Sequence, residues 1–341
     1  MFKVGVIGLG FISETHLRGF SSIAGVEIAA VADVDDERVA ARAADYGVEH
    51  RLQDYRELLQ LQDLDLVVVC LPNNLHARVT IEALDAGHNV LCEKPMATTL
   101  ADAELMTDAA TRNDRTLSIV MNFRWQFFGP DIFYLKKLIE SGDLGEIYYL
   151  RARYLRQVTF PASGFERWNL SREESGGGAL IDLGPHMLDL AMWLSDDYAA
   201  QRVSGFTHHG HISRSQVDDF ASGAVTLAGG TRLNVELAWN SFNESCWQID
   251  VYGEHGGAVI DAHRPAGCRM TRFELVDGET VASDATLDEV GEPPEASLQE
   301  HVVRRMMAGQ LPDCSAERAL KVMRVIDGWY RSSESGAEVV L

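Results

Sequence analysis

Short apolar runs alternate with amphipathic stretches through the first third of the chain. Leu64–Leu71 is almost wholly apolar, which is typical of a parallel strand buried on both faces. We expect strands at Phe2–Ile7, Glu27–Val31, Val48–Arg51, Leu64–Leu71, Asn89–Cys92 and Arg115–Val120. We expect helices ending near Phe20 and spanning Asp36–Tyr46, Asp54–Leu59 (capped by Asp54), Ala77–Ala86 and the residues from a Thr98 cap to Asn113. This alternation predicts an α/β fold, with a doubly wound parallel sheet in a domain of residues 1–122.

The pattern changes in residues 123–341, where apolar and polar positions alternate with a period of two. We expect strands at Ile147–Leu155, Val203–Thr207, Phe220–Leu227, Arg232–Trp239, Trp247–Tyr252 and Gly257–Asp261. Helices are expected at Asp131–Ser141, Ser297–Ala308 and Ala316–Ser332, the last of them packing back on the first domain. The acidic run Asp284–Glu295 is expected to be a mobile or lid-like loop. These elements predict an α+β domain on an open, mainly antiparallel sheet. Its exposed face predicts a homodimer or homotetramer, because another subunit's sheet could cover it.

Charge and cysteine usage narrow the functional class. The chain of 341 residues carries 30 Lys and Arg against 51 Asp and Glu, a net charge of −21. Such acidity argues against nucleic acid and against an anionic membrane surface as partners. The apolar runs are too short to span a membrane. Five scattered cysteines without metal-type spacing favour reduced thiols in a cytoplasmic protein.

A glycine turn joins the first predicted strand to the first helix. Gly8 and Gly10 would allow a pyrophosphate to reach backbone amides at a helix N-terminus. Ser13 stands where a third glycine would allow the closest packing of helix and strand. Asp33, after the second strand, is placed to accept hydrogen bonds from the adenosine ribose, and a carboxylate repels a 2′-phosphate. NAD is therefore preferred over NADP, although Arg38 is a nearby cation that could favour NADP. The alternative interpretation of Asp33 is that it caps a helix.

Polar residues also follow the fourth and fifth predicted strands. Ligands of parallel sheets bind at the carboxyl ends of strands, so Asn73, Asn74 and His76 are placed to touch a cofactor. For Asn74, capping of the next helix is an equal alternative. Lys94, at the end of the fifth strand, is placed to donate or accept a proton, and the following Pro95 allows a cis peptide bond.

A glycine cluster, Gly176–Gly178, opens a helix that carries an acid and a histidine. Asp182 and His186 are four residues apart, so a helix would place them on one face as a proton-transfer pair, although Pro185 predicts a kink. The glycines are expected to let this helix and the preceding loop close over the cofactor. That loop and the exit from the first domain offer four candidates for substrate contact, Arg167, Trp168, Asn122 and Arg124.

A histidine-rich stretch, His208, His209 and His211, could bind a metal. Neither a carboxylate nor a cysteine has fitting spacing, and the stretch is expected in a loop. Solvated histidines are therefore favoured, and no metal site is predicted.

The ordered set of motifs resembles the Gfo/Idh/MocA oxidoreductase family over nearly the whole chain. The resemblance is carried by Gly8-x-Gly10, Asp33, Pro72-Asn73-Asn74-x-His76, Glu93-Lys94-Pro95 and Gly176-Gly177-Gly178-x-x-x-Asp182-x-x-x-His186. It implies a Rossmann domain, a C-terminal oligomerisation domain, and hydride transfer between a nicotinamide cofactor and a carbinol carbon of a sugar, inositol or related polyol.

Carried over to this chain, the resemblance implies three catalytic residues, Lys94, Asp182 and His186. Lys94 and His186 would exchange protons, and Asp182 would orient the substrate or His186. Cofactor contacts are expected from Gly8, Gly10, Phe11, Ile12, Asp33, Leu71, Pro72, Asn73, His76, Glu93 and Lys94. Two other functions remain open: a glycoside hydrolase or lyase that reduces and recycles bound NAD, and a non-catalytic NAD-binding regulator. The intact set of proton-transfer residues argues against the regulator.

Overall fold

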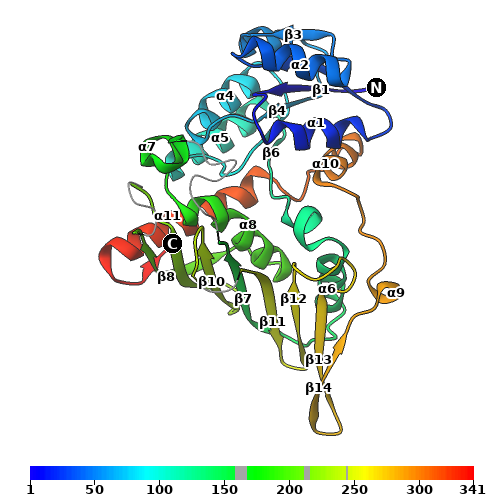
Figure 1. Cartoon of the computed structure of the whole chain (residues 1–341). Helices are drawn as coiled ribbons and strands as arrows, with labels where there is room; N and C mark the ends of the chain where they lie inside the picture. The colour runs from blue at the N-terminus through cyan, green and yellow to red at the C-terminus, as the bar shows by residue number, and fades with distance from the viewer. Residues whose placement is uncertain (158–166, 211–215, 243–244) are drawn as a thin grey trace. The chain divides into compact units, whose positions relative to one another are not determined.

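The computed structural model describes residues 1–157, 167–210, 216–242 and 245–341 (Figure 1). The backbone divides into two compact units. Unit 1 comprises Met1–Val120, Glu173–Gly176 and Ser297–Leu320. Unit 2 comprises Met121–Arg172, Gly177–Ala296 and Lys321–Leu341. Two segments that follow residue 122 in the sequence therefore group with the N-terminal unit.

Unit 1 is built on a six-stranded parallel sheet in the order β3-β2-β1-β4-β5-β6. Its strands are β1 (Phe2–Ile7), β2 (Val26–Ala32), β3 (His50–Leu52), β4 (Leu66–Val69), β5 (Val90–Cys92) and β6 (Leu117–Ile119). Its helices are α1 (Ser13–Ser21), α2 (Asp36–Tyr46), α3 (Tyr55–Leu58), α4 (Asn73–Asp85), α5 (Leu100–Asn113) and α10 (Leu298–Met307), with α7 (Arg172–Ser175) at the unit boundary. The strand order reverses between β1 and β4, the position where such sheets bind ligands at their carboxyl ends. The predicted doubly wound parallel sheet is confirmed.

Two helix starts in unit 1 differ from the sequence prediction. Helix α4 begins at Asn73, directly after Pro72, so Asn74 lies inside the first turn and does not cap the helix. Helix α5 is capped by Thr99, whose side chain accepts a hydrogen bond from the Asp102 amide. The predicted cap, Thr98, is chemically equivalent, and only the register of α5 decides between the two threonines.

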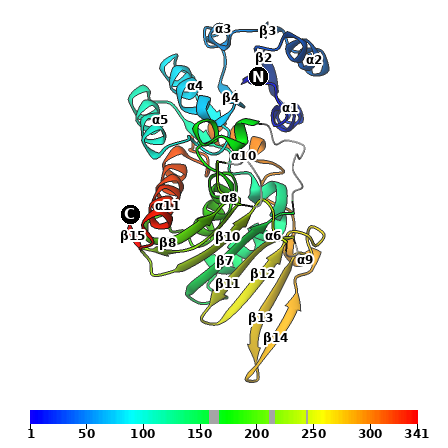
Figure 2. The ribbon, with the colours of Figure 1, turned by 60° about the vertical axis from the view of Figure 1, so that its left-hand side comes forward.

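Unit 2 is built on a nine-stranded sheet in the order β14-β13-β12-β11-β7-β10-β9-β8-β15 (Figure 2). Its strands are β7 (Ile147–Leu155), β8 (Ala200–His208), β9 (Phe220–Leu227), β10 (Arg232–Ala238), β11 (Cys246–Gly253), β12 (Gly256–Asp261), β13 (Met270–Val276), β14 (Glu279–Asp284) and β15 (Val339–Val340). Strands β7 and β10 pair in parallel, and the other neighbours are antiparallel. The predicted open, mainly antiparallel sheet is confirmed.

Helices cover one face of this sheet. The helices of unit 2 are the π-helical turn η1 (Arg124–Phe128), α6 (Pro130–Glu140), the short η2 (Arg167–Leu170), α8 (Ala179–Leu194), α9 (Leu287–Val290) and most of α11 (Ala316–Ser335), and those that pack on the sheet include α6, α8 and α11. Helix α8 packs on β7, β9 and β10, and almost all its residues are buried. Trp329 of α11 packs against Gly205 and Gly223, where a side chain would collide with the indole. No helix in the described ranges is both long and apolar enough to cross a membrane.

Two parts of unit 2 correct the sequence prediction. Strands β13 and β14 form a hairpin that was not predicted, although its Asp277-Gly278 turn, with positive φ at both residues, is a strong hairpin signal. Every residue of β14 is exposed, so the strand lacks the apolar alternation that marked the others. The run from Asp284 to Glu295 is not wholly a loop, because Thr286 and Glu289 form a capping box that begins α9.

Candidate active site

In unit 1, Gly8 and Gly10 form the turn between β1 and α1. Gly8 has a φ of +87°, and a side chain there would collide with the backbone of Cys70. A Cβ at Gly10 would meet no other atom within 4 Å. Ser13 is buried, and its hydroxyl donates to the Gly10 carbonyl oxygen at 2.7 Å, so serine at the third position stabilises the turn. Ile12, the N-cap of α1, gives no side-chain cap, which leaves the end of the helix suited to an anion.

Asp33 ties the end of β2 to the glycine turn. Its Oδ2 accepts a hydrogen bond from the Leu9 amide at 2.6 Å, and its Oδ1 accepts one from the Asp35 amide at 2.9 Å. Asp35, rather than Asp33, caps α2, so the alternative interpretation of Asp33 as a helix cap is wrong. A carboxylate has about four lone-pair positions, so Asp33 can also accept hydrogen bonds from a ligand. Phe11, beside the turn, is 80% exposed.

Lys94 follows β5 in a loop whose neighbouring side chains, Glu93 and Pro95, are buried. The Lys94 side chain is partly exposed, and the Lys94–Pro95 peptide bond is cis. The Lys94 amide donates to Glu93 Oε2 at 3.1 Å. Sequence reasoning found this loop, including the cis bond, but not the side chains that hold it.

Glu93 forms a buried pair with His16 of α1. The distance from His16 Nε2 to Glu93 Oε1 is 2.8 Å, and the two side chains are 1% and 8% exposed. Gln299 of α10 lies on the other side of the imidazole, with its Nε2 3.1 Å from His16 Nδ1. Burial raises the pKa of Glu93, but the hydrogen bond and charge of His16, with the charge of Lys94, outweigh it and hold the pKa below its usual value. Glu93, which was predicted to touch the cofactor, therefore contacts His16 and the Lys94 amide within unit 1.

His76 is buried at the start of α4. Its Nδ1 lies 2.8 Å from the Pro95 carbonyl oxygen, and its Nε2 lies 2.8 Å from the Leu71 carbonyl oxygen. Burial lowers the pKa of His76, although both carbonyls favour a protonated ring. The imidazole thus lies between two strand-end loops, with each ring nitrogen at a backbone carbonyl oxygen. Asn73, at the start of the same helix, donates to the Ser175 carbonyl oxygen at 2.9 Å.

In unit 2, α8 runs without interruption from Ala179 to Leu194, with Pro185 inside it. Asp182 and His186 therefore lie one turn apart on the same face of one helix. Asp182 is partly exposed and His186 is buried. The helix thus carries a carboxylate and an imidazole, two groups that can exchange protons, on one face.

Side chains distant in sequence hold this pair. The Trp239 indole donates to Asp182 Oδ2 at 2.8 Å. The Phe123 ring stacks on His186, with centroids 3.8 Å apart and planes 8° apart. Tyr154 meets Phe123 edge-on at 5.2 Å; burial raises its pKa to about 12, a rise that Arg156 opposes and Asp182 increases. Tyr154 is therefore a neutral phenol near the pair. Sequence reasoning missed these roles because no local motif marks them.

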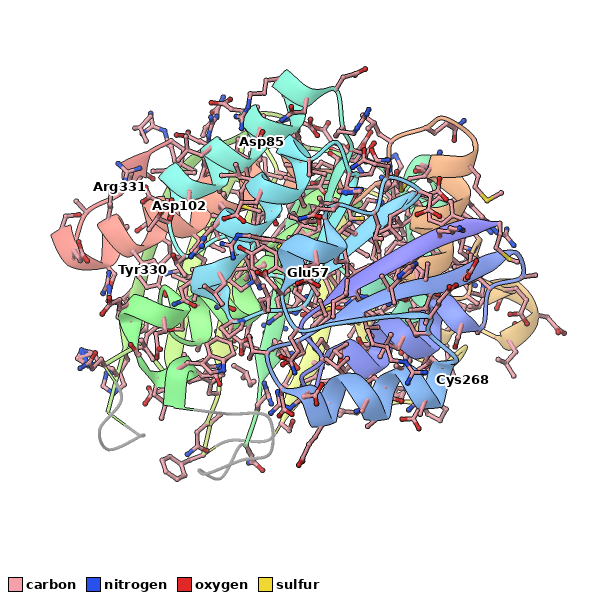
Figure 3. All side chains as sticks on the ribbon, turned by 90° about the horizontal axis from the view of Figure 1, so that it is seen from above. Glu57, Asp85, Asp102, Cys268, Tyr330 and Arg331 are labelled. Carbon is pink, nitrogen blue, oxygen red and sulfur yellow. The ribbon has the colours of Figure 1, made fainter. Side chains whose placement is uncertain are left out.

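The glycine cluster before α8 is explained by contacts inside unit 2. The Asp218 carboxylate accepts hydrogen bonds from the Gly178 amide at 2.9 Å, the Leu180 amide at 2.8 Å and the Tyr330 hydroxyl at 2.9 Å. A side chain at Gly178 would collide with the backbone of Asp218, and one at Gly177 with Tyr330, a residue of α11 labelled in Figure 3. Glycines are therefore needed here to bring Asp218 onto the N-terminus of α8. Burial raises the pKa of Asp218, although these three donors lower it.

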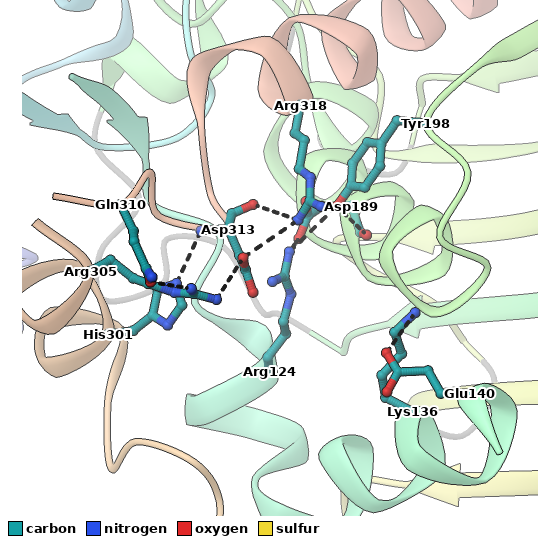
Figure 4. Close-up of polar contacts among 10 residues, drawn as sticks. All are labelled: Arg124, Lys136, Glu140, Asp189, Tyr198, His301, Arg305, Gln310, Asp313 and Arg318. Carbon is teal, nitrogen blue, oxygen red and sulfur yellow. Dashed lines mark hydrogen bonds and ion pairs between the residues drawn. The ribbon is translucent and has the colours of Figure 1, made fainter. Parts of the chain in front are cut away.

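Arg124, predicted to contact substrate, lies in the core of unit 2 (Figure 4). Its guanidinium donates to Asp189 Oδ2 at 2.7 Å, Asp189 Oδ1 accepts the Tyr198 hydroxyl at 2.8 Å, and Trp193 lies under the guanidinium. With 1% of its surface exposed, Arg124 is a buried ion-pair residue, which corrects the expectation.

The other candidates for substrate contact have different positions. Asn122 is partly exposed and donates to Gln126 Oε1 at 2.5 Å. Trp168 is partly exposed in η2. The side chain of Arg167 lies outside the described part of the structure.

A metal site has no support in the described part of the chain. No three His, Cys, Asp or Glu side chains there cluster as ligands. His208 is the last residue of β8, which corrects the expected loop at that position, and His211 lies outside the described residues.

Comparison with known proteins identifies the family of this chain. Residues 2–121 match the model of an oxidoreductase family with an NAD-binding Rossmann fold, and residues 132–259 match the GFO/IDH/MocA C-terminal domain. The chain is 27% identical to the D-glucoside 3-dehydrogenase of Escherichia coli (strain K12), covering 99% of this chain and 97% of that protein. It is 29% identical to the inositol 2-dehydrogenase of Salmonella typhimurium (strain LT2), covering 78% and 76%.

The fold is also shared with a solved structure of levoglucosan dehydrogenase in complex with NADH. The TM-score is 0.88 at 22% identity, covering 99% of this chain and 98% of that chain. The chain therefore belongs to the GFO/IDH/MocA oxidoreductase family.

Proposed function

We propose that this oxidoreductase is an NAD-dependent dehydrogenase that moves hydride between the nicotinamide and a carbinol carbon of a sugar, inositol or related polyol. The observation that carries the proposal is the Lys94 loop, held in one conformation at the carboxyl edge of a Rossmann sheet. The Asp182–His186 pair on α8 supplies a second group able to exchange protons. Alcohol oxidation needs both a hydride acceptor and a base for the hydroxyl proton.

The residues of the glycine turn fit a dinucleotide. Gly10 leaves space, the N-terminus of α1 is open to a pyrophosphate, and Asp33 has lone pairs for ribose hydroxyls. Arg38, which could have favoured a 2′-phosphate, pairs with Asp35 at 3.1 Å. These features support NAD over NADP. When bound, the nicotinamide supplies the hydride-accepting carbon, and the protein supplies position and proton transfer.

Lys94 and His186 are the proposed acid–base residues. A neutral imidazole can take the hydroxyl proton near neutral pH, and an ammonium can stabilise the developing alkoxide. Asp182 is proposed to orient the substrate or His186, with its own carboxylate fixed by Trp239. In unit 2, Asp182 is partly exposed and can bind hydroxyls of the substrate, while the buried Phe123 ring stacks on His186 and Tyr154 packs edge-on against Phe123.

The substrate class is supported by the relatives, which act on a glucoside and an inositol according to their names. Remaining proposed cofactor contacts are Phe11, Leu71, Pro72 and Asn73 from the turn and strand ends, and proposed substrate contacts are Asn122, Arg167 and Trp168. Glu93 and His76 are proposed to act through the Lys94 loop instead of touching the cofactor. We also propose a homo-oligomer formed through the unit 2 sheet and a cytoplasmic location, where all five cysteines would remain the free thiols seen here.

The test is a panel of sugars, inositols and sugar acids, each incubated with the protein and either NAD or NADP. We expect the absorbance of the reduced cofactor to increase with at least one cyclic polyol, and to increase faster with NAD than with NADP. Substrate consumption without net NADH would indicate the NAD-recycling hydrolase or lyase. Binding of NAD without any turnover across the panel would indicate the regulator.

A further inference from the structure

Two buried histidines of unit 1 contact the residues before and after Lys94, His16 at Glu93 and His76 at Pro95. We propose that these two histidines position Lys94 for proton transfer. This inference rests on the proposed function, because it takes Lys94 as an acid–base residue. Neither histidine carries a role in the chemistry itself. Each acts on Lys94 through the backbone of that loop.

The first connection runs from α10 through α1 to the Lys94 amide. Gln299 Nε2 lies 3.1 Å from His16 Nδ1, and His16 Nε2 on the other side of the ring lies 2.8 Å from Glu93 Oε1. The other oxygen of the same carboxylate accepts the Lys94 amide. The residue before Lys94 and its own N–H are therefore fixed by a helix that begins at the glycine turn.

This connection depends on a close approach between α1 and α10. A side chain at Gly19 would come within 3.0 Å of several atoms of Gln299, so glycine makes room for the amide that holds His16. Gln299 and His16 are almost completely buried. The two helices thus define one arrangement of the imidazole and of the carboxylate bound to it.

The second connection holds the residue after Lys94. The ring nitrogens of His76 each lie 2.8 Å from a carbonyl oxygen, Nδ1 from that of Pro95 and Nε2 from that of Leu71, and Leu71 follows β4 in the sheet. With both neighbours of Lys94 fixed, the direction in which the Lys94 side chain leaves the loop is fixed as well. Small displacements of a reacting group are costly, since a shift of about 1 Å can reduce the rate 10²-fold.

An apolar core would stabilise this region more simply. Burying a carboxylate and two imidazoles requires desolvation, and well-packed apolar residues often replace such groups without loss of stability. The hydrogen bonds of these buried groups reach the backbone of the Lys94 loop, at the Lys94 amide and at the Pro95 carbonyl oxygen. A role in fixing the geometry of the Lys94 loop explains why polar groups are buried here and why they contact this loop.

The experiment compares His16→Leu with His16→Gln, whose terminal amide can still donate to Glu93. His88→Leu is the matched control, because His88 is also buried in unit 1 and bonded to a backbone carbonyl, that of Leu59, outside the Lys94 loop. For each variant we would measure kcat, the KM of the substrate, the Kd for NAD and the hydrogen exchange rate of the Lys94 amide.

We expect His16→Leu to lower kcat about 10-fold or more, to accelerate exchange at Lys94 and to leave Kd nearly unchanged. His16→Gln should recover most of kcat, and His88→Leu should lower the melting temperature without lowering kcat. His76→Leu should resemble His16→Leu. Equal kcat losses in His16→Leu and His88→Leu, or unchanged exchange at Lys94, would overturn the positioning role.

A double-mutant cycle separates this inference from the proposed function. If His16 acts through Lys94, His16→Leu should change kcat less than about 2-fold when Lys94 is already alanine. If the double variant loses kcat by the product of the two single losses, the inference is contradicted, but the proposed function is not. A Lys94→Ala variant with normal turnover would instead contradict the proposed function.

Discussion

The proposed proton-transfer groups of the two units are held in different ways. In unit 1 the Lys94 loop is fixed at backbone atoms, by side chains that bond the Lys94 amide and the Pro95 carbonyl. In unit 2 the side chains of Asp182 and His186 are themselves held, by Trp239 and by Phe123. The first arrangement controls where a flexible lysine begins, and the second controls the orientation of short side chains on a helix. A long side chain therefore needs a rigid base, whereas a short one needs direct contacts.

The largest expected effects are those on catalysis in both units. We predict that Lys94→Ala and His186→Ala each lower kcat by about 10²-fold or more, which corresponds to about 2.7 kcal/mol of activation free energy. Lys94→Arg serves as a control, because it keeps the charge but does not release a proton near neutral pH. Steady-state kinetics on folded variants would measure this. Near-normal turnover in either alanine variant would remove that residue from the mechanism.

The next effect concerns the start of α8 in unit 2. Asp218→Ala should lower the free energy of unfolding by about 2 kcal/mol or more, since it leaves the buried Gly178 and Leu180 amides without their acceptor. Tyr330→Phe removes one hydroxyl donor and should cost about 1 kcal/mol. Urea denaturation would compare the two variants. Equal stability of Asp218→Ala and the parent protein would show that α8 does not depend on this carboxylate.

A smaller effect is expected at the glycine turn. Asp33→Ala should weaken NAD binding by about 10-fold and reduce the preference over NADP, because a charged hydrogen-bond acceptor for the ribose is lost. Asp35→Ala is the matched control, since it removes the cap of α2 without removing the Asp33 carboxylate. Titrations with both cofactors would test this. Unchanged affinity of Asp33→Ala for both would exclude the proposed role.

The smallest effect is a pH dependence of stability in unit 1. The pKa of Glu93 is lower in the folded protein than the usual value of 4.5, so ionised Glu93 favours folding at neutral pH. This contribution is complete above that usual pKa and is lost as the pH falls through the lower folded pKa. The stability difference between the parent protein and Glu93→Gln should therefore shrink on acidification. A difference that stays constant from neutral pH to pH values below about 4 would contradict this prediction.

The same contrast explains what the sequence could predict. In unit 1, Gly8, Asp33 and Lys94 lie at the ends of strands, so a local pattern of apolar runs located each of them. In unit 2, Asp182 and His186 were found from their spacing, but Asp218, Trp239 and Tyr154 come from other strands or turns and carry no motif. His16 and Gln299 were missed for the same reason, because residues that are distant in sequence meet only after folding. Arg124 was misplaced, since a charged residue after a strand does not reveal a buried partner such as Asp189.

The most direct test of the central claim follows the hydride itself. A substrate from the panel, deuterated at the carbinol carbon that is oxidised, would be incubated with the protein and NAD, and the reduced cofactor analysed by NMR. The account predicts deuterium at nicotinamide C4, with slower turnover than for the undeuterated substrate. Substrate conversion that leaves deuterium in the released product, or no label in the reduced cofactor, would contradict it.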